Sequence, residues 1–174
     1  VNSNNIDYIA WCWKAGGAPS ADDKAMVDGV ERTITGDAKL DAGTITPTRM
    51  SVNTKAGFSI VKYPGASASN SKLPHGLTQA PEMVIIKNLD NPNGWVVGND
   101  YLTNWGYALG LDLTSEEYTA AVSFDSTAPT NSVITLGNSS GANNSSYNYN
   151  AYCWHSVEGY SKFGSYTGNG SPDG

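Results

Sequence analysis

The sequence predicts an all-β protein, an antiparallel β-sandwich that resembles a jelly roll. Gly, Ser, Asn and Thr together supply 69 of the 174 residues, a composition that favours turns and strands over helices. Short segments of alternating apolar and polar residues follow one another at intervals of about 8 to 12 residues. Clusters of turn-forming residues, such as 90–94 and 137–141, separate them. This order of elements is typical of sandwiches and barrels and differs from that of βαβ units.

Ten segments carry the strand pattern, because β-branched and aromatic residues alternate in them with polar ones. In chain order they are residues 8–14, 44–54, 57–63, 82–88, 95–99, 107–113, 118–124, 132–136, 149–157 and 161–166. The helix candidate is 21–32, which follows Ser20 with two aspartates in its first turn. Gly29 and several β-branched residues weaken a helix there. We therefore expect a loop with at most one helical turn in this segment.

Length, charge and hydropathy exclude several classes of function. A chain of 174 residues is long enough for one domain with its own core. The net charge is −6 and the ten Lys and Arg are scattered singly along the sequence, so nucleic-acid binding is not predicted. No apolar run approaches the roughly 20 residues that span a bilayer, so membrane insertion is not predicted either. The sequence gives no indication of a cofactor.

Internal similarity is the most informative feature of the sequence. Residues 8–14 and 149–155 share four identities in seven positions, and Gly57-Phe58-Ser59 corresponds to Gly159-Tyr160-Ser161 in the same order. The two correspondences predict a repeat unit of about 57–158, with 1–56 completing it and 159–174 starting the next unit. The chain would then be one module cut from a longer repeat protein, with 8–14 and 149–155 in equivalent strands. The alternative is a chance likeness between aromatic strands.

The motifs of the chain resemble those of a known group of proteins. They are residues 8–17, 44–47, 57–61, 75–77, 81–88 and, most specifically, 152–170. Together they resemble a family of uncharacterised tandem-repeat proteins encoded by tailed bacteriophages, mainly marine ones. The resemblance implies a component of the virion surface or tail fibre, assembled in the host cytoplasm, whose partners are other virion proteins or copies of itself. It carries over no catalytic residue, and residues 18–42 match none of its motifs.

The cysteines and histidines do not have the spacing of a metal site. Cys12 and Cys153 lie between aromatic residues in predicted strands; a disulfide between them is one alternative, and we expect instead two reduced, largely buried thiols. His75 lies in a turn, where it would be a surface or turn-stabilising residue. His155 stands where the repeat alignment has Lys14, which predicts a solvent-facing strand position. We therefore predict no zinc site and no other metal site.

Residues suited to hydrolysis are present but unpaired in the sequence. The pattern of a nucleophile elbow, Gly-x-Ser-x-Gly between a strand and a helix, is not found. A glycosidase needs two carboxylates across a cleft, and the candidates are Asp22, Asp23, Asp90, Asp100, Asp112, Glu116, Glu117 and Asp125. Residues 90–100 carry oxygen ligands suited to calcium, but their spacing is better explained by a turn. We predict that the protein is not an enzyme, with a glycoside hydrolase as the alternative.

Aromatic residues are the main chemical resource of the chain. Trp95, Tyr101 and Trp105 lie close together in the sequence with Asn104. An exposed aromatic ring flanked by amides suits the apolar face and hydroxyl rim of a sugar, so these four residues are the predicted ligand-binding site. The alternative, which we favour for Trp95 and Trp105, is that their rings fill the core.

These observations and the resemblance together predict a phage virion structural protein, a tail-fibre or capsid-surface module with a role in adhesion to host-surface glycans. A polysaccharide-degrading phage enzyme module and a secreted bacterial adhesin are the alternatives. A cleft with two carboxylates at hydrolytic spacing would separate the enzyme from the binding module.

Overall fold

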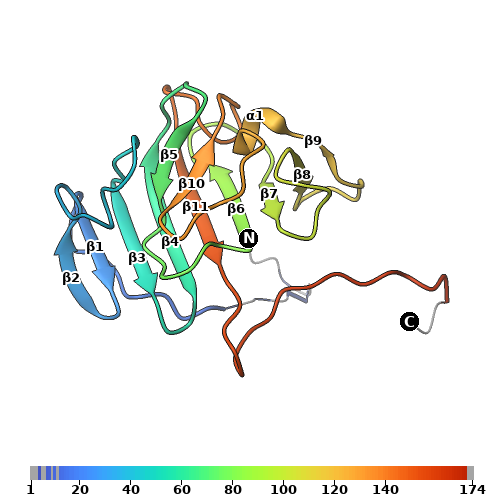
Figure 1. Cartoon of the computed structure of the whole chain (residues 1–174), viewed down its shortest axis with the longest axis horizontal. Coiled ribbons are helices and arrows are strands. Elements are labelled where there is room, and N and C mark those ends of the chain that lie inside the picture. The colour runs from blue at the N-terminus through green and yellow to red at the C-terminus, as the bar shows by residue number, and fades with distance from the viewer. Residues whose placement is uncertain (1–3, 5–6, 9, 11, 172–174) are drawn as a thin grey trace.

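The computed structural model describes residues 4, 7–8, 10 and 12–171, which form eleven strands and one short helix (Figure 1). The strands are β1 (Lys24–Val27), β2 (Val30–Thr33), β3 (Arg49–Asn53), β4 (Phe58–Pro64), β5 (Ser71–Pro74), β6 (Met83–Asn88), β7 (Val96–Asn99), β8 (Tyr107–Gly110), β9 (Tyr118–Thr119), β10 (Val133–Leu136) and β11 (Asn148–Trp154). Helix α1 is Ala121–Phe124. The predicted all-β class is confirmed, with at least eight strands and no more than one short helix in the described residues.

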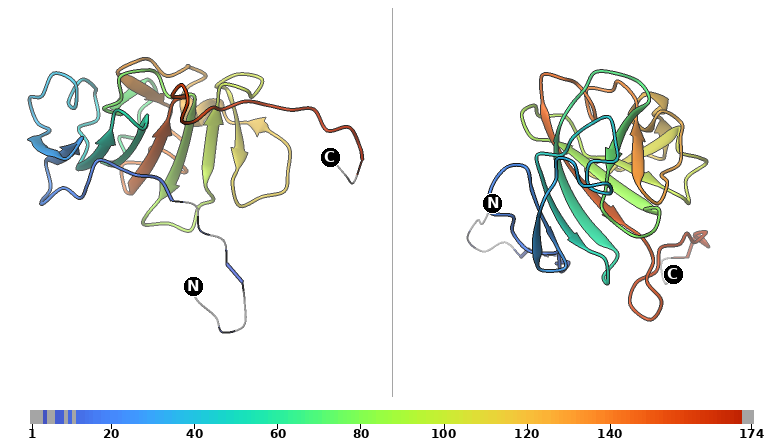
Figure 2. Two further views of the ribbon diagram at one scale, coloured as in Figure 1. Left: turned by 90° about the horizontal axis from the view of Figure 1, so that it is seen from below. Right: turned by 60° about the vertical axis from the view of Figure 1, so that its left-hand side comes forward.

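The strands form a sandwich of two unequal layers. Nine of them make a large sheet in the order β2-β1-β3-β4-β11-β6-β7-β8-β9, and β10 and β5 make a second, small sheet. Neighbours in the large sheet are antiparallel except β1 and β3, which are parallel. The small sheet lies in front of the large one in Figure 1, and Figure 2 shows the layers from two other directions. Strand β11 lies at the centre of the large sheet, between β4 and β6.

The core lies between the two layers and is filled by alternate residues of the central strands. Val61 and Tyr63 of β4 and Tyr149 and Cys153 of β11 are fully buried there. The rings of Tyr63 and Tyr149 stack with their centroids 5.4 Å apart. The Tyr63 hydroxyl donates a hydrogen bond of 2.7 Å to the carbonyl oxygen of Ala142. This pairing lets two large rings be buried without leaving a polar atom unsatisfied.

The segment 21–32 is a β-hairpin, so the expected loop with one helical turn is wrong. Strands β1 and β2 pair in antiparallel register through Val27 and Val30. Asp28 and Gly29 connect them with φ angles of +51° and +85°. Two consecutive residues with positive φ make a type I′ turn, whose twist matches that of the paired strands and for which Asp-Gly is a preferred sequence. The Asp-Gly pair was therefore a hairpin signal, and the β-branched residues that weaken a helix suit these strands.

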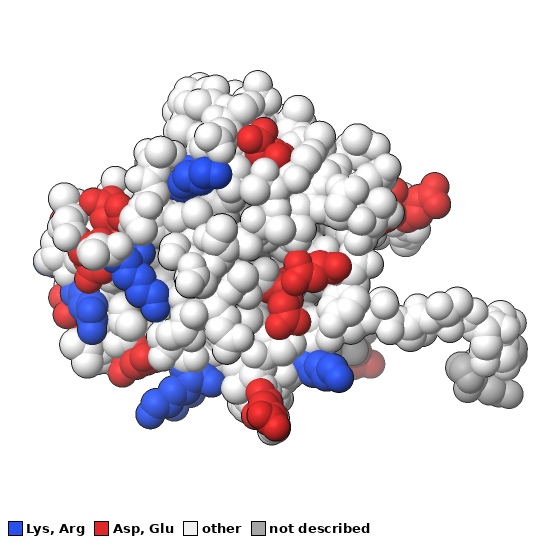
Figure 3. Space-filling model, in the orientation of Figure 1, with Lys and Arg blue, Asp and Glu red and all other residues white. Residues whose placement is uncertain are grey.

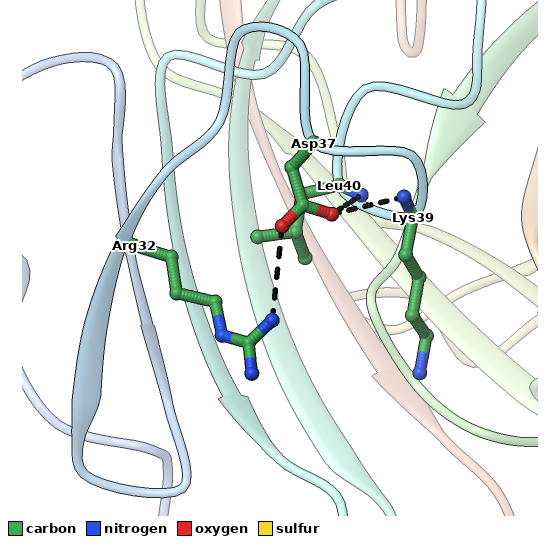
Figure 4. Close-up of polar contacts among 4 residues, drawn as sticks. All are labelled: Arg32, Asp37, Lys39 and Leu40. Carbon is green, nitrogen blue, oxygen red and sulfur yellow. Dashed lines mark hydrogen bonds and ion pairs between the residues drawn. The ribbon is translucent and has the colours of Figure 1, made fainter.

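The loop after β2 is held in place by Asp37. Its carboxylate accepts hydrogen bonds from the backbone N–H groups of Lys39 and Leu40, at 2.9 and 3.0 Å, and lies 3.8 Å from the Arg32 guanidinium (Figure 4). Those bonds, with smaller contributions from neighbouring positive charges, lower the pKa of Asp37. The loop places Leu40 and Ile45 in the core on the same side as the small sheet.

The expected strand at residues 8–14 is not formed. Tyr8, Ala10 and residues 12–14 lie outside any strand, while Ile9 and Trp11 lie outside the described residues. The matching segment 149–155 forms β11 almost throughout. The two segments therefore do not occupy equivalent strand positions, and the repeat unit at 57–158 loses the structural equivalence on which it depended.

Other differences concern the lengths of elements. Strand β5 was not predicted, because Pro74 and the polar residues around it read as a turn. The predicted strand 118–124 is divided between β9 and α1, and 161–166 forms only an isolated bridge between Val157 and Ser161. Within the described part of the chain, no helix is long and apolar enough to cross a membrane.

Candidate functional site

The candidate site is the side of the large sheet that faces away from the small sheet, called the outer face from here on. Alternation along the strands decides which residues lie on it. In β11, Tyr149 and Cys153 belong to the core, so Asn150, Tyr152 and Trp154 lie on the outer face. By the same reasoning and the strand register, the central part of the outer face consists of Phe58, Ile60, Lys62, Met83, Ile85, Lys87, Trp95, Val97, Asn150, Tyr152 and Trp154.

Four aromatic rings form a continuous line across the outer face. Trp95 lies 6.2 Å from Tyr152, Tyr152 lies 6.3 Å from Trp154, and Trp154 lies 5.0 Å from Phe58, measured between ring centroids. The planes of neighbouring rings differ by 30°, 21° and 26°. We call these four residues the aromatic ladder. It crosses the strands diagonally, from the start of β7 to the start of β4.

The N-terminal segment covers one end of the aromatic ladder. The ring of Trp13 packs edge-on against Trp154, with 5.3 Å between centroids, and against Phe58 at 6.2 Å. The segment is fixed to the outer face by bonds from Asn53 and Ser51 of β3 to its backbone carbonyl oxygens. Figure 2 shows this segment on the side of the large sheet opposite the small one. Phe58 and Trp154 are consequently buried, at 4% and 5% exposure.

The other end of the aromatic ladder reaches solvent, since Trp95 and Tyr152 are only partly buried. The Lys87 ammonium lies 5.9 Å from the centroid of the Trp95 ring and donates to the carbonyl oxygen of Asn93. The backbone N–H of Trp95 donates to the Asp112 carboxylate at 3.1 Å. Contacts on two sides therefore fix Trp95 before any ligand arrives, which reduces the entropy that binding would cost.

Two hollows lie along β7 and β8. One, of about 410 Å³, lies over β6, β7 and β8 and is lined by apolar side chains including Met83, Val97 and Leu109. The other, of about 340 Å³, lies beside Trp95 and has a more polar lining that includes Asn93, Asp112, Tyr118 and Ser140. Aromatic rings on a rigid sheet, with polar groups at the margin, suit a ligand that has both apolar faces and hydroxyl groups. This arrangement suits the binding of such a ligand.

The structure does not place the four predicted site residues on one exposed surface. Trp105 is 5% exposed, its ring meets Phe124 edge-on at 5.2 Å, and its indole N–H donates to the Asp100 carboxylate at 2.8 Å. Trp105 is therefore a core residue and cannot be an exposed stacking ring. Tyr101 is 47% exposed in the turn after β7, and the Asn104 side chain accepts a bond from the Gly106 N–H. Of the four, only Trp95 lies on the outer face, and its assignment to the core is wrong.

The carboxylates considered for hydrolysis are mostly committed to local hydrogen bonds. Asp23 accepts bonds from Thr35, Asp90 from Asn148 and Glu117 from Thr103, and these bonds lower the pKa of each of the three carboxyl groups. Asp22 pairs with Arg49, Asp100 accepts from Trp105, Asp112 from Trp95 and Asp125 from Asn70. In the described residues no group of three His, Cys, Asp or Glu side chains is placed to hold a metal ion.

The expectation that the chain lacks the Gly-x-Ser-x-Gly pattern of a nucleophile elbow is wrong, because residues 137–141 read Gly-Asn-Ser-Ser-Gly. An elbow places its serine between a strand and a helix. Here the segment follows β10 and continues into turns, and the Ser139 hydroxyl accepts a bond from the N–H of Gly141. The backbone N–H groups of Ala142 and Asn143 donate to the Ser139 carbonyl oxygen. The motif therefore forms a turn and does not have the strand-to-helix setting of an elbow.

Both histidines are buried. His75 is 0% exposed, and its Nδ1 accepts a bond from the Leu77 N–H while Nε2 lies 3.1 Å from the Thr130 carbonyl oxygen. The turn-stabilising role is confirmed and the surface position is wrong. His155 is 2% exposed, so its predicted solvent-facing position is wrong, because the inward alternation of β11 continues to this residue. The alignment of His155 with Lys14 gave a wrong prediction, because residues 12–14 do not share the geometry of β11.

The two cysteines have different environments. Both are free thiols. Cys153 is buried in the core, and burial raises the pKa of its thiol to about 12, partly opposed by the Ser59 hydroxyl. Cys12 is exposed, so its predicted burial is wrong. Its segment lies on the outer face as a loop and does not form the central strand that buries Cys153.

The sequence interpretation missed Tyr152, Trp154 and Phe58 as members of one surface. The signal was present, because Ala151 and Cys153 alternate with Tyr152 and Trp154. Alternation separates two faces of a strand but does not say which face a second layer covers. Only the topology shows that the Tyr152 face is the one left without a covering sheet.

A comparison with family models decides to which family the chain belongs. Residues 1–174 match the model of a family described as Domain of unknown function (DUF7483). The chain belongs to this family. Neither the curated proteins nor the solved structures contain a match to it.

Proposed function

We propose that this DUF7483 domain is a non-catalytic binding module that attaches its parent protein to host-surface glycans. The observation that carries the proposal is the open end of the aromatic ladder, where Trp95 and Tyr152 are only partly buried on a rigid sheet. Sugar rings stack on such rings through their C–H faces, while their hydroxyls bond to polar groups at the edge. Large rings with few rotatable bonds bind with little loss of conformational entropy.

The proposed setting is the surface of a phage virion, in a tail fibre or capsid-surface protein assembled in the host cytoplasm. The motifs that resemble phage tandem-repeat proteins support this setting, and other virion proteins or further copies of the chain would be its partners. A secreted adhesin that carries the same module would use the same surface. The hydrolase alternative needs two carboxylates facing each other across a cleft, whereas the candidate carboxylates hydrogen bond within or beside their own loops.

The test is a glycan array and a binding assay on host cells with the purified chain and three variants. Tyr152→Ala should reduce binding at least tenfold, a loss typical of a hot-spot residue. Tyr101→Ala tests the turn after β7 as the binding site. If the ligand binds on the outer face, this variant should bind as the wild type does. Tyr166→Ala is the control, since Tyr166 is 95% exposed in the C-terminal segment. Full binding by Tyr152→Ala with loss in Tyr101→Ala would contradict the proposal.

A further inference from the structure

The strand register places four of the ten Lys and Arg residues in one line across the outer face. Lys24 of β1 pairs with Arg49 of β3, and Arg49 pairs with Lys62 of β4. Lys62 pairs with Asn150 of β11, and Asn150 pairs with Lys87 of β6. Four strand spacings of about 4.8 Å make this line about 19 Å long. We call these five residues the cation row.

The cation row was hidden in the sequence, where its members are scattered singly. They come together because each occupies the outward position of its strand at the same level of the sheet. On the side of the molecule drawn in Figure 3, by contrast, charged side chains are scattered between broad uncharged areas. In a protein of net charge −6, four of the ten cationic side chains therefore lie in one line on a single face.

Acidic residues lie beside part of the cation row. Asp22 pairs with Arg49 at 2.6 Å, but both side chains are largely exposed, so the pair contributes little and can exchange partners. Asp90 lies near Lys62, whose charge contributes to the lowered pKa of Asp90, after the larger effect of the Asn148 bonds. Glu31 and Asp23 lie near Lys24.

The central stretch of the row is the best placed for a ligand. Asn150 lies between Lys62 and Lys87, one strand spacing of about 4.8 Å from each. In the described part of the chain, the side-chain amide of Asn150 makes no hydrogen bond. Tyr152 lies two residues along the same strand from Asn150, about 6.6 Å away, and the Lys87 ammonium lies over the ring of Trp95. Two cations and an amide donor therefore border the open end of the aromatic ladder.

We propose that Lys62, Asn150 and Lys87 bind the negatively charged substituent of a sugar whose ring stacks on Trp95 or Tyr152. The ligand is then an acidic polysaccharide, and the cation row guides its chain across the strands. This inference rests on the proposed function and specifies its substrate class. A carboxylate and a sulfate share the necessary chemistry, since each accepts bonds from ammonium and amide donors. Nucleic acid fits less well, because its dense charge meets Asp22 and Asp90 beside the row and a chain of net charge −6.

The experiment is affinity electrophoresis of the full chain in gels that contain a single polymer. The carboxylated probes are polygalacturonate, alginate and hyaluronate, the sulfated probe is dextran sulfate, the neutral probes are dextran and galactomannan, and duplex DNA is included. We expect retardation by at least one acidic polysaccharide, decreasing as salt rises. The double variant Lys62→Gln/Lys87→Gln should bind at least about tenfold more weakly. Lys55→Gln/Lys162→Gln changes the net charge equally at exposed positions away from the row and should bind as the wild type does.

Each outcome bears on the inference separately from the proposed function. Retention by a carboxylated or sulfated polymer, lost in the Lys62/Lys87 variant, supports the inference and identifies the substituent. Retention by neutral polymers alone, lost in Tyr152→Ala, leaves the proposed function standing and overturns the acidic ligand. Equal binding by the two double variants, or duplex DNA bound as tightly as the best polysaccharide, also overturns it. No retention by any polysaccharide contradicts both proposals.

Discussion

Acidification should destabilise the protein through His75. The ring is fully buried, and its Nδ1 accepts the Leu77 N–H at 3.1 Å. A proton on Nδ1 would face that donor and place a charge in the core. Burial lowers the pKa of His75 from 6.5 to about 4; the Thr130 carbonyl opposes the shift, and the charges of Lys39 and His155 add to it. The folded protein therefore keeps His75 neutral over a pH range in which the unfolded chain takes up a proton.

The direction and size of the effect follow from linkage. Between pH 6.5 and pH 4 the unfolded state binds more protons, so the free energy of unfolding falls as the pH falls. Above pH 6.5 His75 makes no pH-dependent contribution, and below pH 4 its loss is complete. A shift of about 2.5 units, at about 1.36 kcal/mol per unit, makes the full loss about 3 kcal/mol. About 2 kcal/mol of it should be lost between pH 7 and pH 4.5.

The assay is urea denaturation of the wild type and of His75→Asn at pH 7.0, 5.5 and 4.5. Asn keeps an oxygen acceptor near the Leu77 N–H but does not titrate. Carboxyl groups of lowered pKa, such as Asp37, also make the protein less stable as the pH falls. Their contribution is the same in both proteins, so it cancels when the two losses are compared. The variant should be less stable at pH 7 and lose about 2 kcal/mol less on acidification. Equal losses in the two proteins would refute the assignment to His75.

Three further predictions concern packing, reactivity and capping. Gly98→Ala should destabilise the fold by about 1–3 kcal/mol, because a methyl group there would lie 2.5 Å from a core ring atom; Gly164→Ala, with open space around it, should change the urea midpoint little. Cys12 should react with a thiol reagent in the native protein, whereas Cys153 should react only on unfolding; rapid reaction of both would contradict the buried position of Cys153. Asp37→Ala should cost about 1 kcal/mol in urea denaturation, a typical loss for a backbone cap, and no change would show that the Asp37 bonds are dispensable.

The sequence predicts the class of the fold and most of its central strands. The regions of β4, β6, β7, β10 and β11 are found because alternation is strong where one face of a strand is buried. The hairpin of β1 and β2 is missed because every residue of β2 is exposed, so its pattern lacks the apolar side that marks a strand. The Asp28-Gly29 turn was the local signal that could have identified it.

The candidate site depends on information that local patterns do not contain. Trp95 and Trp105 look alike in sequence, yet one lies on the outer face and the other packs against Phe124. Whether each ring is buried depends on which side of β7 the rest of the chain covers. The cation row likewise cannot be found from local sequence patterns. The strands of Lys62 and Lys87 are brought near each other only because both pair with β11, which comes much later in the sequence.

The most direct test of the central claim is an NMR titration of the isotope-labelled chain with the oligosaccharide that binds best on the array. If the outer face is the binding surface, the largest shifts will fall on the backbone amides of β6 and β11 and on Trp95, and Tyr152→Ala will abolish them. Shifts confined to the turn at residues 100–105, or to the small sheet formed by β5 and β10, would contradict the account.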